Sequence, residues 1–506
     1  MGIHDFTIYD FISRNAQIYP DRDGIVFNGV RLSHKQYKER CDRLAAGLLR
    51  LSISKGDRLG VVARNCDEFA VLYGAAAKIG SIVLPVNWRF KQDEMEYVLN
   101  DCTPKVVFAG QDYRKMVTEA ARKVKSIERC YTIGGGEVPE GFLPFEGLYA
   151  QDGAEEEIDI PADSGFVIIH TAAVGGHPRG ALLSQANIVF NNFLLMHQWS
   201  LNPGDCHICI LPLYHLAGLA LFMSVMHAGG KNVILEHFDP ELTLQLIEKE
   251  KGTIFFNFPP ILKTIMDKYE EGSYDISSLR NVTGPDLPEN IRRFHKIAPH
   301  ARCWTSYGQT EAMGVSASPF DEKPGSAGRP CLSAQVALFD DYNNAVPVGT
   351  PGEICVRSPT IFLGYWGRDE DNAYTFRNNW HHTGDMGRFD EDGYLWYEGR
   401  KSEKELIKPG GENVYPVEVE KAILEHPSVE EVSVIGVPDR EWLEAIKAVC
   451  VLKKGEALTE AELIEFVAAR IARYKKPKYI VFVPSLPKNK DGSIDRQKVK
   501  ADYGRS

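Results

Sequence analysis

Residues 58–86 read RLGVVARNCDEFAVLYGAAAKIGSIVLPV, and this stretch indicates the class of fold. The run RLGVVAR is typical of a buried strand, and FAVLYGAAAKIGSIVLPV (69–86) predicts a buried helix that runs into a second strand. Lys78 and two glycines interrupt the apolar run, so it is too mixed to span a bilayer. A strand, a helix and a strand in succession predict a βαβ unit and a mostly parallel sheet.

The same alternation extends on both sides of this unit. Up to about residue 160 it includes the helix-like SHKQYKERCDRLAAGLLRL and the strand-like PKVVFAG, which together predict a first α/β lobe. From GFVIIHTA to about residue 320 it recurs, which predicts a second α/β lobe with the strands VIIHT, HICILPL, NVILE, TIFFNF and RCWTSYG.

Beyond residue 325 the sequence no longer alternates long helix-like and strand-like segments. The short runs QVALFDD, GEICVRSP and GYLWYEG predict a small antiparallel, barrel-like lobe that ends near residue 399. Mixed α and β segments then return, including VEEVSVIGVPD, KAVCVLKKG and the helix-like TEAELIEFVAARIARY. We therefore predict an α/β protein with an N-terminal domain over 1–399 and a small α+β C-terminal domain over 400–506.

Composition limits the classes of function. The chain has 506 residues, 44% hydrophobic and 25% charged, which fits an ordinary soluble protein with at least two cores. A net charge of −11 does not favour binding to nucleic acid or to an anionic membrane surface, which both attract positively charged proteins. The start MGIHDFTIYD lacks a secretory pattern, and the ten cysteines are spread thinly, so we expect a cytoplasmic protein.

A local cluster raises the alternative of a metal site. The stretch DCHICILPLYH holds Cys206, His207, Cys209 and His215. No second cysteine pair follows, and CHICILPL alternates like a buried strand. A zinc site is therefore disfavoured.

A glycine-rich stretch follows an apolar strand at IIHTAAVGGHPRGALLSQAN (168–187). Gly175 and Gly176 would let backbone N–H groups approach a phosphate, and Arg179 adds positive charge. The stretch is neither a Walker loop nor a dinucleotide fingerprint, so a flexible turn remains the alternative.

Five further motifs occur in a fixed order along the chain. They are LPLYHLAGL (211–219), TSYGQTEAMG (305–314), WHHTGDMGRFDEDGYLWYEGR (380–400), KELIKPGGENVYPVEVE (404–420) and LPKNKDGSIDR (486–496). With the glycine-rich loop, they resemble the adenylate-forming superfamily of acyl-CoA synthetases, adenylation domains and luciferases over essentially the whole chain. The resemblance implies a mobile C-terminal domain and one site for two half-reactions, in which ATP and a carboxylic acid give an acyl-adenylate and a thiol then displaces AMP.

The resemblance also implies roles for residues on the nucleotide side. Asp385 is expected to accept hydrogen bonds from the ribose hydroxyls, and Arg400 to bind ribose or phosphate oxygens. Glu311 is expected to bind Mg²⁺, with Thr310 on the phosphate side. The remaining expected nucleotide contacts are Thr171, Gly175, Gly176, Arg179, Gly284, Pro285, Tyr307 and Gly308.

The acyl and CoA sides follow by the same resemblance. His215 is expected at the gate of the acyl pocket, although a core histidine would otherwise be the better interpretation. Lys408 is expected to face the site in the thioester-forming conformation, and the hinge is expected at Lys401, Ser402 or Glu403. Further expected residues are Phe258, Gly308, Met313 and Gly314 in the acyl pocket and Gly410 and Gly411 along the CoA path. An apolar acid is expected, whether aliphatic, alicyclic or aromatic, and the sequence leaves a homodimer open.

The sequence departs most from the superfamily pattern at the residues that are expected to act in the adenylation step. Thr171 is followed by Ala172, Ala173 and Val174, so several phosphate-directed hydroxyls are missing, and Arg179 replaces a lysine. Ser493 stands where the superfamily has its adenylation lysine, a loss expected to slow adenylation by roughly 10²–10³-fold.

Three interpretations remain open. The favoured one is an AMP-forming acyl-CoA synthetase that uses ATP, Mg²⁺ and CoA, with adenylation impaired at Ser493. The others are an enzyme redirected to acyl-adenylate or acyl-CoA chemistry and a non-catalytic protein that binds nucleotide or acyl-CoA. Loading of a carrier protein is less favoured, because no carrier-like segment is visible in this sequence.

Overall fold

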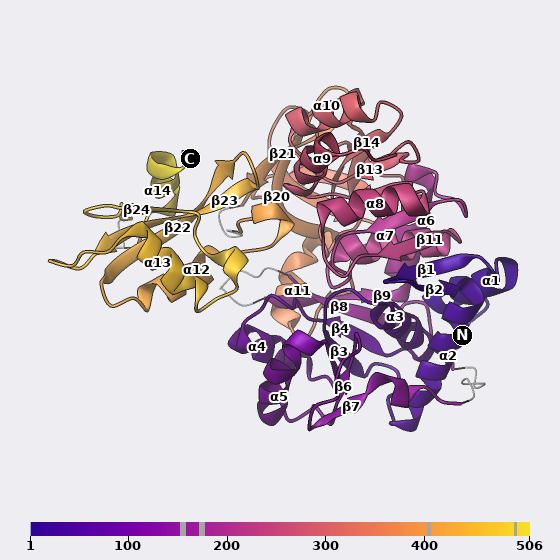
Figure 1. Cartoon of the computed structure of the whole chain (residues 1–506). Helices are drawn as coiled ribbons and strands as arrows, with labels where there is room; N and C mark the ends of the chain where they lie inside the picture. Colours follow the sequence, from indigo (N-terminus) through magenta and orange to yellow (C-terminus); the bar gives the residue numbers. More distant parts are fainter. Residues whose placement is uncertain (1, 152–157, 172–177, 402–405, 490–492, 506) are drawn as a thin grey trace.

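Four β-sheets organise the chain in the computed structural model, which describes residues 2–151, 158–171, 178–401, 406–489 and 493–505. The large domain and the small C-terminal domain are side by side in Figure 1, where the small domain is gold. Among the described helices, none has both the length and the apolarity to cross a bilayer.

The βαβ unit is confirmed at residues 58–85. Strands β3 (Arg58–Val62) and β4 (Ile82–Pro85) pair in parallel, with Arg58 opposite Ile82 and Val61 opposite Pro85. Helix α3 (Asp67–Ile79) connects them and is buried on nearly every side. A helix that is apolar all round is stable only when it is enclosed, and this one packs inside the large domain against α1 (Ile8–Ile18) and α2 (His34–Arg50).

The two large sheets share the N-terminal domain. The first has the order β19-β9-β8-β4-β3-β5-β6-β7, and the second has the order β16-β15-β14-β13-β12-β10-β11-β1-β2. Their remaining strands are β1 (Asp23–Phe27), β2 (Val30–Ser33), β5 (Val106–Ala109), β6 (Arg129–Thr132), β7 (Phe142–Pro144), β8 (Gly165–Thr171), β9 (Arg179–Ser184), β10 (Cys206–Cys209), β11 (Lys231–Ile234), β12 (Ile254–Phe256), β13 (Asn281–Thr283), β14 (Arg302–Tyr307), β15 (Ser316–Pro319), β16 (Arg329–Pro330) and β19 (Gly364–Tyr365).

The sequence boundary between the two α/β lobes needs correction. The strand in GFVIIHTA was expected to open the second lobe, but β8 pairs with β4 and β9 in the first sheet. Conversely, β1 near the N-terminus pairs with β11 and so belongs to the second sheet. Sheet membership depends on pairing between distant segments, and the local alternation of helix and strand does not carry that information.

The third and fourth sheets are smaller. Strands β17 (Gln335–Phe339), β18 (Gly352–Arg357), β20 (His381–Phe389) and β21 (Leu395–Arg400) form an antiparallel sheet in the predicted small lobe. Strands β22 (Val429–Asp439), β23 (Leu443–Leu452) and β24 (Tyr479–Phe482) form the sheet of the C-terminal domain. Strand β21 ends at Arg400, beside the predicted boundary at 399/400, which stays a prediction.

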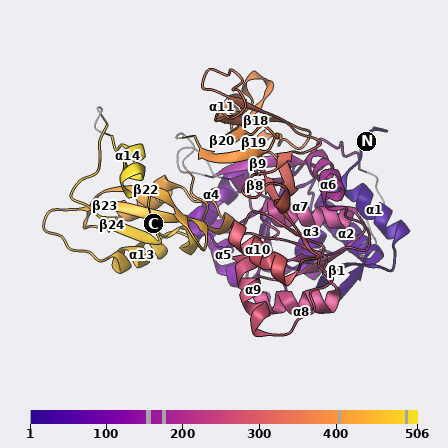
Figure 2. The same ribbon diagram turned by 90° about the horizontal axis from the view of Figure 1, so that it is seen from above.

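The remaining helices cover the sheets (Figures 1 and 2). Those of the large domain are α4 (Gln92–Cys102), α5 (Arg114–Lys123), α6 (Gln185–Trp199), α7 (Leu216–His227), α8 (Pro240–Glu250), α9 (Ile261–Glu271), α10 (Pro288–Ile297) and α11 (Asp369–Thr375). Those of the small domain are α12 (Pro416–Leu424), α13 (Glu460–Ala468) and α14 (Arg496–Tyr503). Helix α13 ends at Ala468, before the expected TEAELIEFVAARIARY segment is complete.

Candidate active site

A cavity of about 1050 Å³ lies between the large and the small domain. Its walls come from the end of β14, from Asp385 in the middle of β20, from α6 and α7, and from the segment that enters the small domain. The expected site residues that line it are Thr171, His215, Phe258, Gly284, Pro285, Tyr307, Gly308, Thr310, Glu311, Met313, Gly314, Asp385, Arg400, Lys408 and Gly411. The fold thus brings into one space residues that are far apart in the sequence.

Asp385 and Arg400 face each other on paired strands. They are opposite in the register of β20 and β21, with 3.8 Å between Arg400 Nε and Asp385 Oδ1. The hydroxyl of Tyr307 donates to Asp385 Oδ2 at 2.8 Å, and burial together with this carboxylate raises the pKa of Tyr307, so its hydroxyl stays a donor. A buried carboxylate held in this way is suited to accept hydrogen bonds from vicinal hydroxyl groups of a sugar.

Glu311 is a second buried carboxylate in the cavity wall. Its Oε1 accepts from Thr171 Oγ1 at 2.5 Å and from the Tyr365 hydroxyl at 3.0 Å. Arg179 Nη2 donates to the same tyrosine hydroxyl at 3.0 Å, so its positive charge lies behind Tyr365 and Arg179 itself does not line the cavity. Two hydroxyl groups orient the carboxylate of Glu311. Its oxygens are hard ligands of the kind that Mg²⁺ on a triphosphate prefers. The expected Gly175 and Gly176 lie outside the described residues.

Glu412 was not expected from the sequence, although it follows the GG pair of the same motif. It accepts hydrogen bonds from Tyr214 at 3.1 Å, lies 3.3 Å from His215 Nε2, and forms an ion pair with Arg89. Burial alone would raise its pKa, but His215, Arg89 and Tyr214 lower the pKa of Glu412 to about 2. The anion connects the segment before α12 to the large domain and holds the imidazole of His215 at the cavity.

Lys408, Gly410 and Gly411 belong to the segment that leads into the small domain, and they approach the cavity from that side. The backbone N–H of Lys408 donates to Glu444 Oε2 at 2.7 Å, and Arg400 Nη1 lies 3.5 Å from the same oxygen. Gly411 has φ of +87°, and a Cβ built there would lie 3.0 Å from the ring of Phe258. Gly410, with φ of +57°, sits against Trp442 beside the cavity but does not line it.

Ser493 lies outside the cavity in this arrangement. It is exposed, and Asn489 donates to its carbonyl from the backbone at 2.8 Å and to its hydroxyl at 3.0 Å. Lys488 forms an ion pair with Glu431 at 2.5 Å, whereas Lys490 lies outside the described residues. From the same end of the chain, α14 instead contributes Arg496, Gln497 and Lys500 to the cavity wall.

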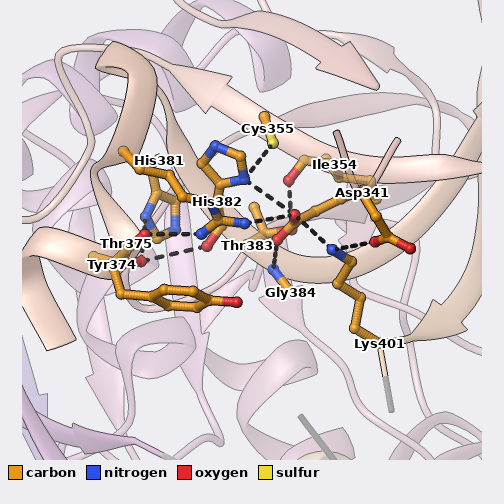
Figure 3. A network of polar contacts seen from close by, with 12 residues as sticks. Asp341, Ile354, Cys355, Tyr374, Thr375, His381, His382, Thr383, Gly384 and Lys401 are labelled. Atoms are coloured by element: carbon orange, nitrogen blue, oxygen red, sulfur yellow. Dashed lines mark hydrogen bonds and ion pairs between the residues drawn. The ribbon is translucent and has the colours of Figure 1, made fainter. Parts of the chain in front are cut away.

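A network of polar contacts supports the part of β20 that holds His382, Thr383 and Gly384, directly before Asp385 (Figure 3). The carboxylate of Glu353 on β18 accepts from the backbone N–H of Gly384 at 3.1 Å, and it lies 3.0 Å from Arg377 Nη2 and 3.2 Å from Lys401 Nζ. Lys401, the first of the hinge candidates, also pairs with Asp341 at 2.9 Å. Ser402 and Glu403 lie outside the described residues. Glu353 thereby connects Lys401, at the start of the predicted hinge, to the segment of β20 that precedes Asp385.

The cysteine and histidine cluster is divided between two places. His207, on β10, bonds through Nδ1 to Asn232 at 2.8 Å, and burial lowers its pKa to about 4. His215 lies at Glu412, as described above. The two histidines therefore have separate partners in the described structure.

Comparison with known proteins gives the class that this fold and site define. The chain belongs to the family described as AMP-binding enzymes, because residues 12–366 match the model of that family. Residues 418–493 match the model described as the AMP-binding enzyme C-terminal domain.

Individual relatives agree with this assignment. The indoleacetate–CoA ligase of Aromatoleum aromaticum is 32% identical, over 97% of each chain. The long-chain-fatty-acid–CoA ligase of Bacillus subtilis is 30% identical, over 97% of this chain and 94% of the relative. A solved structure of the o-succinylbenzoate CoA synthetase of Bacillus subtilis superposes with a TM-score of 0.84 over 97% of each chain, at 24% identity, which shows a shared fold.

Proposed function

We propose that this chain is an AMP-forming acyl-CoA synthetase, an acid–thiol ligase that converts a carboxylic acid, ATP and CoA into acyl-CoA, AMP and pyrophosphate. The observation that carries the proposal is the shared cavity. It joins the nucleotide-side groups Tyr307, Glu311 and Asp385 to Lys408 and Gly411, which come from the segment leading into the small domain.

In the first half-reaction an oxygen of the substrate carboxylate attacks the α-phosphorus of ATP, and pyrophosphate leaves. Asp385 orients the ribose through its hydroxyl groups, with Arg400 at 3.8 Å from that carboxylate. Glu311 would hold Mg²⁺, which offsets the negative charge of the phosphates. Gly284, Pro285 and Tyr307 form the wall expected beside the adenine.

In the second half-reaction the sulfur of CoA attacks the carbonyl carbon of the acyl-adenylate, and the carbon–oxygen bond to AMP breaks. We place the pantetheine arm along Gly411, which lines the cavity, and along the neighbouring Gly410; the lack of side chains lets these two residues pack closely against Phe258 and Trp442. Lys408 lines the cavity while Ser493 lies outside it, which supports a thioester-forming arrangement in this structure. The small domain would turn about the hinge that begins at Lys401 to reach the adenylating arrangement.

The first experiment compares the chain with a Ser493→Lys variant. We expect the added ammonium to raise acid-dependent pyrophosphate release by roughly 10²–10³-fold, because it restores a charge next to the developing negative charge of the transition state. A Ser485→Lys variant is the matched control, since Ser485 is an exposed serine at the start of the same segment. AMP, pyrophosphate and CoA thioester are measured over a panel of aliphatic, alicyclic and aromatic acids.

A second candidate function follows from Ser493, which carries no charge. An enzyme redirected to acyl-adenylate or acyl-CoA chemistry, or a protein that only binds these molecules, would need no adenylation lysine. No thioester from any acid in either variant, together with retained binding of AMP or acyl-CoA, would favour this candidate.

The partners follow from the same proposal. They are a small carboxylic acid and CoA, while a homodimer stays an untested expectation. All ten cysteines are unpaired, and nine of them are buried, which fits a reducing compartment such as the cytoplasm.

A further inference from the structure

One face of α6 lines the cavity over a length that the nucleotide does not account for. Asn191, Leu195 and Trp199 all line the cavity, and their spacing of four residues places them in one row along the helix. The row begins beside Gly314, because a Cβ built at Gly314 would lie 3.6 Å from Asn191 Oδ1. It ends at Trp199, about 12 Å further along the helix axis at a rise of about 1.5 Å per residue. We call the part of the cavity beside Asn191, Leu195 and Trp199 the α6 branch.

The end of the α6 branch at Trp199 lies away from the nucleotide side of the cavity. The side-chain amide of Asn281 donates from Nδ2 to the carbonyl oxygen of Trp199 at 3.2 Å, and Asn281 Oδ1 accepts from Trp304 Nε1 at 2.9 Å. Asn281 is the first residue of β13, whereas Gly284, an expected nucleotide contact, follows the last. An acyl group that starts at the α-phosphate and enters the α6 branch therefore extends toward Trp199.

Trp199 closes this end of the branch. It is 3% exposed, so only a small part of the residue faces the cavity, and the rest packs in an apolar cluster with Leu201, Val225 and Ile254. A side chain enclosed in a close-packed core cannot move aside without disturbing its neighbours. Beside it, Gln198 Oε1 accepts from Cys331 Sγ at 3.8 Å, which joins α6 to the segment after β16.

The surface of the α6 branch suits an apolar chain. Leu195, Trp199 and the partly buried Phe256 belong to one apolar cluster, and all three line the cavity. Ala220 lines the cavity from α7, which packs against α6, and its small side chain leaves space there. Each CH₂ group buried on such a surface should strengthen binding by roughly fourfold.

We infer that Trp199 sets the upper length of the acid that this protein activates. The inference rests on the proposed synthetase function and adds its substrate class, an apolar acid of medium length whose chain occupies the α6 branch. Affinity should rise with chain length until the chain meets Trp199, and a longer chain should then lose affinity, because it has to displace packed side chains.

The test uses sulfamoyl-adenosine analogues of acyl-adenylates, whose binding does not depend on the adenylation step. The analogues carry butanoyl, octanoyl, dodecanoyl or hexadecanoyl groups, and their Kd values are measured by calorimetry. We expect octanoyl or dodecanoyl to bind most tightly, and butanoyl and hexadecanoyl each to bind at least tenfold more weakly. In a Trp199→Ala variant the hexadecanoyl analogue should gain at least tenfold relative to the octanoyl analogue.

Leu201→Ala is the matched control. Leu201 belongs to the same apolar cluster as Trp199 but does not line the cavity, so its loss weakens the packing without lengthening the branch. The preferred chain length should therefore stay the same in this variant. If Trp199→Ala unfolds, Ala220→Leu replaces it, and the added bulk on α7 should shift the preference toward the butanoyl analogue.

The outcomes separate the inference from the function on which it rests. Affinity that still rises from dodecanoyl to hexadecanoyl in the unaltered protein overturns the inference, since the chain would then pass Trp199, and the synthetase function would stand. An unchanged preference in Trp199→Ala, or in Ala220→Leu where that variant replaces it, overturns the inference as well. If no analogue binds and no acid yields thioester even in the Ser493→Lys variant, the synthetase function fails and the inference fails with it.

Discussion

At the scale of single residues, side chains from separate motifs line one cavity, and side chains from distant segments hold them there. Asp385, Glu311 and Lys408 each belong to a long ordered motif, and each lines the cavity. Glu412 also lies within a quoted motif, but its importance depends on Arg89 and His215, which reach it from distant segments. Such partners cannot be read from spacing along the chain, because they meet only after the two domains come together.

Gly411 provides a prediction at the same scale. A Gly411→Ala substitution would place a Cβ 3.0 Å from the ring of Phe258, so we expect it to obstruct the CoA path. CoA-thioester formation should fall by roughly tenfold or more while acid-dependent pyrophosphate release changes little. Both rates are measured on the same preparation of enzyme.

The control is Gly455→Ala. Gly455 also has φ of +87°, and nothing lies within 4 Å of a Cβ built there, so this change adds the same backbone strain without the obstruction. Equal losses of thioester formation in the two variants would contradict a role for Gly411 along the CoA path.

At the scale of elements, hydrophobic periodicity predicted most strands and helices but not how the strands pair. The predicted strands QVALFDD, GEICVRSP and GYLWYEG correspond to β17, β18 and β21. The assignment of β8 to the second lobe was wrong, since β8 pairs with β4 and β9. Pattern predicts that a segment is extended and buried, and only the assembled sheet decides its neighbours.

Glu353 on β18 contacts Gly384 of β20, Arg377 and Lys401, and these contacts support the second prediction. A Glu353→Gln variant would remove the anion between Arg377 and Lys401, and the two cations would remain without it. We expect the free energy of unfolding to fall by about 3–5 kcal/mol, the usual cost of breaking a buried ion pair. The affinity for AMP should weaken as well, because the Gly384 N–H that precedes Asp385 loses its charged acceptor.

Combining this change with Lys401→Met tests the network directly. Removing one cation should offset part of the loss, so the double variant should be less destabilised than the sum of the two single variants. Urea denaturation of all four proteins gives the coupling. Additive effects would show that the ion pair between Lys401 and Glu353 does not stabilise the fold.

At the scale of the whole molecule, the two-domain plan was predictable and the contact between the domains was not. Lys475, just before β24, is 5% exposed and forms ion pairs with Glu94 of α4 in the large domain and with Glu418 at 2.7 Å. A buried lysine with partners from both domains fixes their relative orientation in this arrangement. Nothing in the local sequence distinguishes it from its neighbour Lys476.

These neighbouring lysines form a matched pair for a prediction. In the Ser493→Lys background, Lys475→Met should slow CoA-thioester formation by about tenfold or more and affect pyrophosphate release less, because it weakens the thioester-forming arrangement. Lys476→Met should leave both rates nearly unchanged, since the ammonium of Lys476 pairs with Glu465 of the same domain at 3.4 Å, an ion pair at the surface. A proportional fall in both rates for Lys475→Met would indicate general destabilisation.

The pairing of β1 with β11 has a consequence for the way the chain is made. Strand β1 emerges from the ribosome early, but its parallel partner is Asn232 to Ile234, about 200 residues later. At typical synthesis rates the β1–β2 hairpin must wait for about 10–40 seconds with that edge uncovered. The nascent chain therefore cannot complete its second sheet in the order of translation, and we expect an early pause or truncation to expose a hairpin that holdase chaperones recognise.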